Sequence, residues 1–212
     1  MAARPKASEA RDTRTEILDV ALELFADKGF YGVSIRDVAR ATGVGVSALY
    51  HHFPSKEELF EAVVFGDARV GSKPTLGPGE PPPFTGDADE LNVYLEKIMV
   101  HAMERFATSR ERKRFRIFLS DGPRLALDGK MNLFDRMLGA RKPMIDLMAH
   151  LMDRNLVRRA DPELTALGFI APLLMWRQLT GISPDHIWVE RPREFARHCV
   201  DQFLRGVVPR PE

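Results

Sequence analysis

The stretch from residue 34 to residue 59, SIRDVARATGVGVSALYHHFPSKEEL, constrains the fold of this chain more than any other part. Ser34 is suited to cap a first short helix, and Gly43 stands where a helix C-terminus needs a left-handed residue. The apolar residues of that helix fall on one face: Ile35, Val38 and Ala39. A second short helix then follows Gly45. Two short helices joined by a glycine turn are typical of a helix-turn-helix, which reads DNA.

The residues after Gly45 separate into two faces when they are placed on a helix. The inner face holds Ala48, Leu49 and His52, and the outer face holds Val46, Ser47, Tyr50 and His51. A seryl hydroxyl can bond a base edge and a valyl side chain can pack against a thymine methyl group, whereas phenol and imidazole groups suit phosphate oxygens. We therefore expect the outer face to enter a DNA major groove.

A third helix is predicted to begin after Pro54. Ser55 followed three residues later by Glu58 forms a capping box, which satisfies two backbone N–H groups. Lys56 lies on the first turn, where a cation opposes the helix dipole, so its position favours a nearby phosphate. The candidate DNA contacts of the whole stretch are Ser34, Arg36, Gly45, Val46, Ser47, Tyr50, His51 and Lys56.

Residues 13 to 28 predict an amphipathic helix that covers the two short helices and ends at Gly29. Its expected buried residues are Ile17, Val20, Ala21, Leu24 and Phe25. Ahead of it lies a polar arm that carries Arg4, Lys6, Arg11 and Arg14. We interpret this arm as a solvated tail, with a minor-groove arm as the alternative.

These motifs resemble the tetracycline-repressor (TetR) family of bacterial transcriptional regulators. The resemblance rests on a first helix ending FADKGF, followed in order by SIRDVARATGV, LYHHF and PSKEEL, and it covers roughly the first third of the chain. Gly45 stands where the family commonly has Ser, which removes a helix cap and one DNA contact. The resemblance implies a dimeric regulator, most often a repressor, that binds a palindromic operator and is released by a small-molecule effector.

The remainder of the chain predicts an all-α protein. Residues 71 to 86 are dominated by Gly and Pro and are expected to form a loop. Helical periodicity then predicts helices at 88–107, 110–121, 129–154, 162–181 and 191–205. The expected division is a helix-turn-helix domain over residues 1–56 and a helical effector-binding and dimerisation domain over 57–212.

Methionine-rich stripes on the later helices are the candidate effector site. Met144, Met148 and Met152 recur at helical spacing, and Met99 and Met103 form a similar stripe. Pro143 and Pro172 are expected to kink or interrupt their helices and to leave room for a ligand. Ordinary core packing is the alternative. The resemblance to TetR proteins favours an apolar or amphipathic ligand among Met99, Met103, Phe106, Met144, Met148 and Trp176.

The last two predicted helices are the candidates for self-association. LTALGFIAPLLMWRQLTG is apolar on nearly every side, so it must be buried on several sides. The final helix offers a partner stripe: Phe195, Cys199, Val200 and Phe203. Two such helices from each chain predict a four-helix homodimer interface, with a closed monomeric core as the alternative.

Composition excludes several other classes. The formal net charge is +1, with 44% hydrophobic and 29% charged residues, which favours a local basic surface over a charge-driven nucleic-acid coat. Cys199 is alone and no apolar run reaches membrane-spanning length, so we expect a cytoplasmic protein without membrane contact. Nucleotide, P-loop, HExxH, GxSxG and CxxC motifs are absent, so we expect no cofactor. A helical enzyme or metal-binding bundle, suggested by His101 and Glu104, is the alternative.

Overall fold

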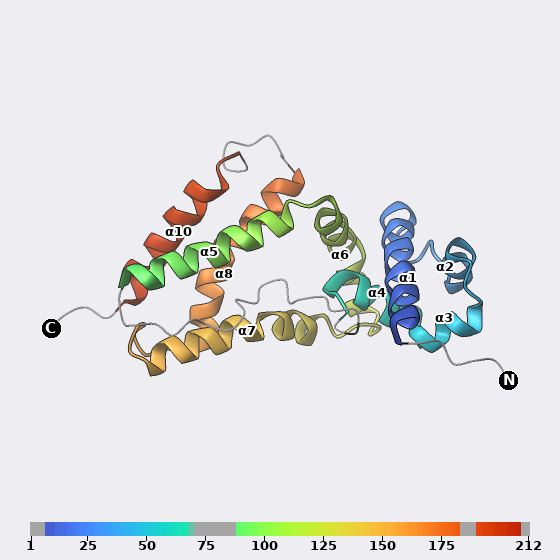
Figure 1. Ribbon diagram of the computed structural model, residues 1–212, viewed down its shortest axis with the longest axis horizontal. Coiled ribbons are helices and arrows are strands. Elements are labelled where there is room, and N and C mark those ends of the chain that lie inside the picture. Colours follow the sequence, from blue (N-terminus) through green and yellow to red (C-terminus); the bar gives the residue numbers. More distant parts are fainter. Residues whose placement is uncertain (1–6, 68, 70–87, 183–189, 209–212) are drawn as a thin grey trace. The chain divides into compact units, whose positions relative to one another are not determined.

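The computed structural model describes residues 7–67, 69, 88–182 and 190–208. All the regular secondary structure within these residues is α-helical, which confirms the predicted all-α fold (Figure 1). The predicted loop at 71–86 lies outside the described residues. None of the helices described is both long and apolar enough to cross a membrane.

The chain forms two compact units. Unit 1 comprises residues 1–73 and 110–136, and unit 2 comprises residues 74–109 and 137–212. These bounds differ from the expected division after residue 56, because residues 110–136 join the N-terminal helices. The functional division after residue 56 stays a prediction.

The described residues of unit 1 form four helices near the N-terminus and one helix from later in the chain. They are α1 (Ala7–Lys28), α2 (Ile35–Thr42), α3 (Val46–His52), α4 (Lys56–Phe65) and α6 (Ser109–Leu127). Helix α1 begins at Ala7, so the part of the predicted solvated tail from residue 7 onward is helical instead. Residues 1–6 lie outside the description.

The core of unit 1 is aromatic. Phe60 of α4 meets Phe25 and Phe30 edge to face, with ring centroids 5.4 and 5.3 Å apart. The buried face of α1 consists of Ile17, Leu18, Ala21, Leu22 and Phe25. Val20 and Leu24, which were expected in this face, are only partly buried. The face is therefore rotated from the predicted one toward Leu18 and Leu22, which belong to the same apolar core as residues of α2 and α4.

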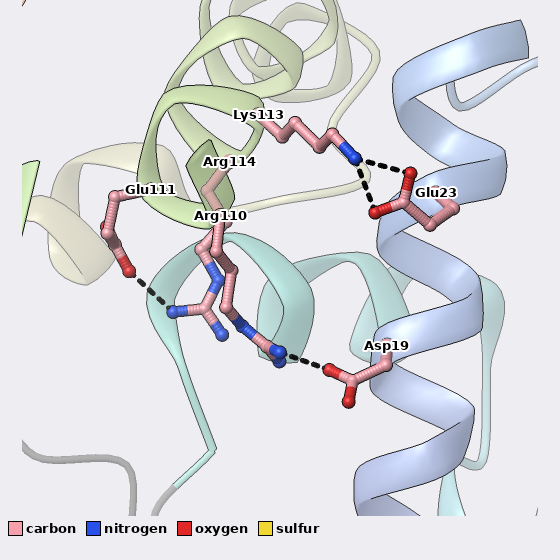
Figure 2. A network of polar contacts seen from close by, with 6 residues as sticks. All are labelled: Asp19, Glu23, Arg110, Glu111, Lys113 and Arg114. Carbon is pink, nitrogen blue, oxygen red and sulfur yellow. Dashed lines mark hydrogen bonds and ion pairs between the residues drawn. The ribbon is translucent and has the colours of Figure 1, made fainter. Parts of the chain in front are cut away.

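Helix α6 joins unit 1 through both apolar and charged contacts. Ile117 and Leu125 lie in the same core as α1 and α4. On the surface, Arg110 pairs with Asp19, and Lys113 Nζ lies 2.6 Å from Glu23 on α1 (Figure 2). The basic residues of the stretch 110–116 thus form part of the contact between α6 and α1. Their partners are about 90 residues away in sequence, so local pattern could not reveal them.

Unit 2 consists of four long helices around an apolar core. They are α5 (Ala88–Phe106), α7 (Leu133–Asp153), α8 (Pro162–Ile182) and α10 (Pro192–Val207). Helix α10 packs against α5 and α8, and the rings of Phe169 and Phe203 meet edge to face at 5.2 Å. Pro162 and Pro192 are the first helical residues, as expected.

The prolines inside the helices of this protein do not end them. Helix α7 continues through Pro143 and α8 through Pro172, and α6 extends past its predicted end at 121 through Pro123. The helices are therefore not interrupted at these prolines, and the alternative expectation of a kink stays a prediction. One proline removes one backbone bond, whereas α7 and α8 each retain 21 residues of helix with a face buried in the core.

Candidate nucleic-acid interface

Helix α2 is fixed at both ends by the residues that its sequence suggested. The Ser34 hydroxyl accepts from the Asp37 N–H, and the Asp37 carboxylate accepts from the Ser34 N–H at 2.9 Å, which closes a capping box. The hydrogen bonds from Ser34 lower the pKa of Asp37. At the other end Gly43 has φ 69°, a left-handed conformation that favours glycine. The turn into the next helix is thereby defined.

Helix α3 presents an exposed face and is anchored by one fully buried residue. Leu49 is completely buried, whereas Val46 and Tyr50 are 39% and 48% exposed. Ser47 and His51 are exposed as well, so the four residues predicted to face DNA all face solvent. Ala48, expected on the inner face, is exposed, because a helix of only seven residues buries little more than one side chain here. Gly45 precedes the helix without a side-chain cap.

Lys56 has a role that the sequence did not suggest. Its Nζ donates to the carbonyl oxygens of Phe30 and Val33, both at 3.0 Å, and lies 3.9 Å from the centroid of the Phe30 ring. Burial lowers the pKa of this amine. The contact links the first turn of α4 to Val33, the residue before Ser34, which caps α2. The expected phosphate contact of Lys56 stays a prediction beside this structural role.

Arg36, the remaining candidate, and Ser55, a helix cap, both lie at helix starts. Arg36 is exposed on the first turn of α2. Ser55 caps α4, since its hydroxyl accepts from the Glu58 N–H at 3.0 Å. Both helix N-termini therefore carry the partial positive charge that attracts phosphate oxygens, with exposed polar residues beside it.

A buried ion pair behind α3 was missed by sequence reasoning. Arg14 Nε lies 2.5 Å from Asp67 Oδ2, and another N–H of the same guanidinium donates to the carbonyl of His52. The guanidinium also lies 3.9 Å from the centroid of the Phe53 ring. Burial, with a smaller contribution from Arg14, lowers the pKa of His52. The available signal was spacing: position 14 precedes the apolar residue at 18 by one helical turn.

The candidate effector residues come together in unit 2. Met99, Met103, Phe106, Met144, Met148 and Trp176 all belong to one apolar cluster, and none is more than 2% exposed. His101 and His150, on the helices α5 and α7, are exposed and do not belong to this cluster. The effector role of the six residues stays a prediction. Among the residues described, no group of three or more His, Cys, Asp or Glu residues is placed to hold a metal ion.

Comparison with known proteins gives a consistent pattern over the N-terminal helices. Residues 17–63 match the family model described as bacterial regulatory proteins, tetR family. The HTH-type transcriptional regulator AcrR of Shigella flexneri is 35% identical over 112 residues, which are 52% of this chain and 49% of that protein. The HTH-type transcriptional repressor KstR2 of Rhodococcus jostii is 45% identical over 53 residues, 25% of this chain and 26% of that one. The chain thus spans about half or less of the length of the curated relatives it matches.

Solved structures resemble the whole chain in fold. A regulator from Mesorhizobium loti is 19% identical with a TM-score of 0.67, over 97% of this chain and 100% of that one. NalD of Pseudomonas aeruginosa, the secondary repressor of the MexAB-OprM multidrug efflux pump, is 22% identical with a TM-score of 0.65, over 93% and 97%. SmeT in complex with triclosan is 21% identical with a TM-score of 0.66, over 95% and 100%. At these identities the likeness establishes the fold alone.

Proposed function

We propose that this chain, whose residues 17–63 match the model for bacterial regulatory proteins of the tetR family, is a transcriptional regulator rather than an enzyme. It acts as a repressor that binds a palindromic operator as a dimer and is released by a small-molecule effector. The observation that carries this function is the exposed face of α3, held between a closed α2 turn and a capped α4.

The four exposed residues of α3 divide the work of DNA binding. Ser47 and Val46 stand nearest the helix N-terminus and read base edges and thymine methyl groups. Tyr50 and His51 contact phosphates, which set register. Gly45 supplies no side chain, so recognition depends on fewer base contacts than a serine would allow.

Dimerisation is supported by an apolar face that α8 leaves exposed. Leu164, Leu167 and Met175 are exposed on this helix, with Gly168 and Ala171 between them on the same side. Contiguous exposed apolar residues mark interaction surfaces. Phe195, Cys199 and Phe203 of α10 are half-buried and extend the apolar surface. A second copy covers this face, because one reading head alone recognises too few base pairs for a specific operator.

Effector control acts through the methionine-rich core of unit 2. Unbranched methionine side chains repack more readily than branched ones, so an apolar or amphipathic molecule can be admitted among them. A hundredfold change in operator affinity requires about 2.7 kcal/mol of preference for the DNA-incompetent state. The triclosan complex of SmeT, a protein of similar fold, supports a small organic ligand of this kind. The site of action is the cytoplasm, where the operator DNA is.

Selection of bound fragments from the source genome tests the function. The purified chain should enrich a palindromic duplex, with half-sites about one helical turn or a modest multiple apart. The variant Val46→Ala with Ser47→Ala should change the enriched sequence, whereas the control Lys142→Ala, on the exposed surface of α7, should not. Enrichment of no fragment, together with a monomer in light scattering at micromolar concentration, would overturn the proposal.

A Leu167→Asp variant tests the dimer face separately. A charge in the centre of an apolar interface is left without a partner on association. The variant should be monomeric in light scattering and should bind a full operator no better than a single half-site. The matched control is Lys142→Asp, which places the same side chain at an exposed position of helix α7. A dimeric Leu167→Asp variant would count against this face.

A further inference from the structure

The buried pair of Arg14 and Asp67 joins three elements of unit 1. Arg14 lies on α1, Asp67 follows the end of α4, and the carbonyl that Arg14 binds belongs to His52, the last residue of α3. The two charged side chains are only 10% and 6% exposed. Removing one partner of such a pair leaves a buried charge without compensation, so both must be present together.

Helix α3 has little else to hold it. It spans seven residues, it has no side-chain cap at Gly45, and Leu49 is its one fully buried residue. Helices this short do not persist without tertiary contacts. The last carbonyls of a helix lack intrahelical partners and carry partial negative charge, so a cation there is favourable. The guanidinium of Arg14 is therefore a C-terminal cap for α3, supplied by another helix.

Asp67 fixes the direction of that cap. It binds Nε of the guanidinium with one oxygen, while its other oxygen accepts from the Arg69 N–H at 2.9 Å. The residue before it, Gly66, has φ 88°, a conformation that side chains rarely adopt. The position of Asp67 is thus set by how the chain leaves α4.

We propose that Arg14 is a positioning residue for DNA binding: held by Asp67, it caps α3 and makes the angle of the DNA-reading face depend on the path of the chain after α4. This inference rests on the proposed function, in which α3 reads the operator. Arg14 touches no DNA itself, because it is buried behind the helix.

The test compares three variants on a duplex that the wild-type chain retains. Arg14→Gln should weaken operator binding about tenfold, the size of one charge-assisted hydrogen bond. Asp67→Asn should act in the same direction, and in the Arg14→Gln background it should add little, because Asp67 acts through Arg14. The slope of affinity against salt and the preferred bases should both stay as in the wild type, since no phosphate or base contact is lost.

Hydrogen exchange separates positioning from general stability. The amide N–H groups of Leu49 and Phe53, which bond within and just after α3, should exchange faster in Arg14→Gln, whereas that of Val38 in α2 should not. Arg14→Lys keeps the positive charge but lacks the planar guanidinium with its several N–H donors. It should therefore bind the operator more tightly than Arg14→Gln and less tightly than the wild type.

Arg114→Gln is the matched control. Arg114 forms a similarly buried pair with Glu111 in the same unit, with side chains 11% and 9% exposed. This variant should lower the melting temperature to a similar extent but leave operator affinity and α3 exchange unchanged well below that temperature. Equal effects of Arg14→Gln and Arg114→Gln on operator affinity would overturn the inference. Failure of the wild-type chain to retain any duplex would instead overturn the proposed function.

If Arg14→Gln does not fold, the milder Asp67→Asn carries the same test. An Asp67→Asn variant that folds and binds the operator as tightly as the wild type, with unchanged exchange in α3, would reject the role of the pair.

Discussion

The two units of this protein are held together by different chemistry. In unit 1 each of the helices α2, α3 and α4 has an end tied by a specific polar contact, and Arg14, Asp67 and Glu111 are buried. Among the described residues of unit 2, the buried polar or charged side chain is Thr180, which bonds a carbonyl of its own helix. Directional bonds fix angles, whereas apolar contacts permit repacking.

This difference matches what each unit is proposed to do. A surface that reads base edges must hold its side chains at a defined angle, and polar caps supply that angle. A core that admits a ligand must exist in more than one packing, and methionine-rich packing allows it. The contrast predicts that substitutions of similar size have different consequences in the two cores.

The largest effect is expected from the aromatic core of unit 1. Phe60→Ala removes a fully buried ring that meets Phe25 and Phe30, and such truncations cost about 3–5 kcal/mol of the free energy of unfolding. Urea denaturation should show this loss, with operator binding abolished at 37 °C. Met148→Ala, a truncation in the core of unit 2, should cost about 2–5 kcal/mol but should leave ligand-free operator affinity near that of the wild type below its melting temperature. Equal losses of operator affinity in the two variants would remove the contrast between the cores.

A smaller effect is expected when the methionine core is overfilled. Met148 is completely buried, and Met148→Trp should cost about 1–3 kcal/mol through strain. Its ligand-free operator affinity should stay near that of the wild type, while release by an effector, once one is found by screening, should be blunted. Titration of the operator complex with that effector measures the response. Unchanged effector affinity and unchanged release would exclude Met148 from the site.

The sequence predicted most of what is local in this comparison. Ser34, Gly43 and Ser55 cap or end helices where their types and positions suggested, because capping depends on neighbours within four residues. The helices of unit 2 were placed to within a few residues by their periodicity.

Contacts between segments that are distant in the sequence could not be predicted from local sequence patterns. Three contacts form only when distant segments come together in the folded protein. They are the ion pairs between α1 and α6, the hydrogen bonds from Lys56 to the carbonyls of residues 30 and 33, and the ion pair of Arg14 with Asp67. Charged residues at helical spacing look alike whether they face solvent or another helix, so composition does not distinguish these cases. Helices α7 and α8 continue through their prolines for a related reason, because tertiary burial sustains a helix that local rules would end.

A substitution of Lys56 tests whether its amine serves mainly to bind the two carbonyls of unit 1 or to contact a DNA phosphate. Lys56→Ala should weaken binding to good and mutated operators alike and should lower the salt slope by about one unit per reading head if the amine meets a phosphate. Loss of the two carbonyl bonds should also destabilise unit 1 by about 1–3 kcal/mol. Tyr50→Phe, which removes one exposed hydroxyl without touching the core, is the control for a contact with DNA alone. A lower stability with an unchanged salt slope would mean that Lys56 binds only the two carbonyls and contacts no phosphate.

The smallest expected effect concerns pH and again belongs to unit 1. Burial, and to a lesser extent Arg14 and His51, lower the pKa of His52 below its unfolded value of about 6.5. Near and below that pH, His52 binds a proton more readily in the unfolded chain than in the folded one. The free energy of unfolding should therefore fall as pH drops from about 7.5 to about 5.5. The melting temperature of His52→Gln should depend less on pH over this range than that of the wild type. Arg14→Gln should raise the pKa of His52 in an NMR titration, since it removes a neighbouring cation. A pKa of His52 that does not respond to Arg14→Gln would mean that the guanidinium is not held beside the end of α3.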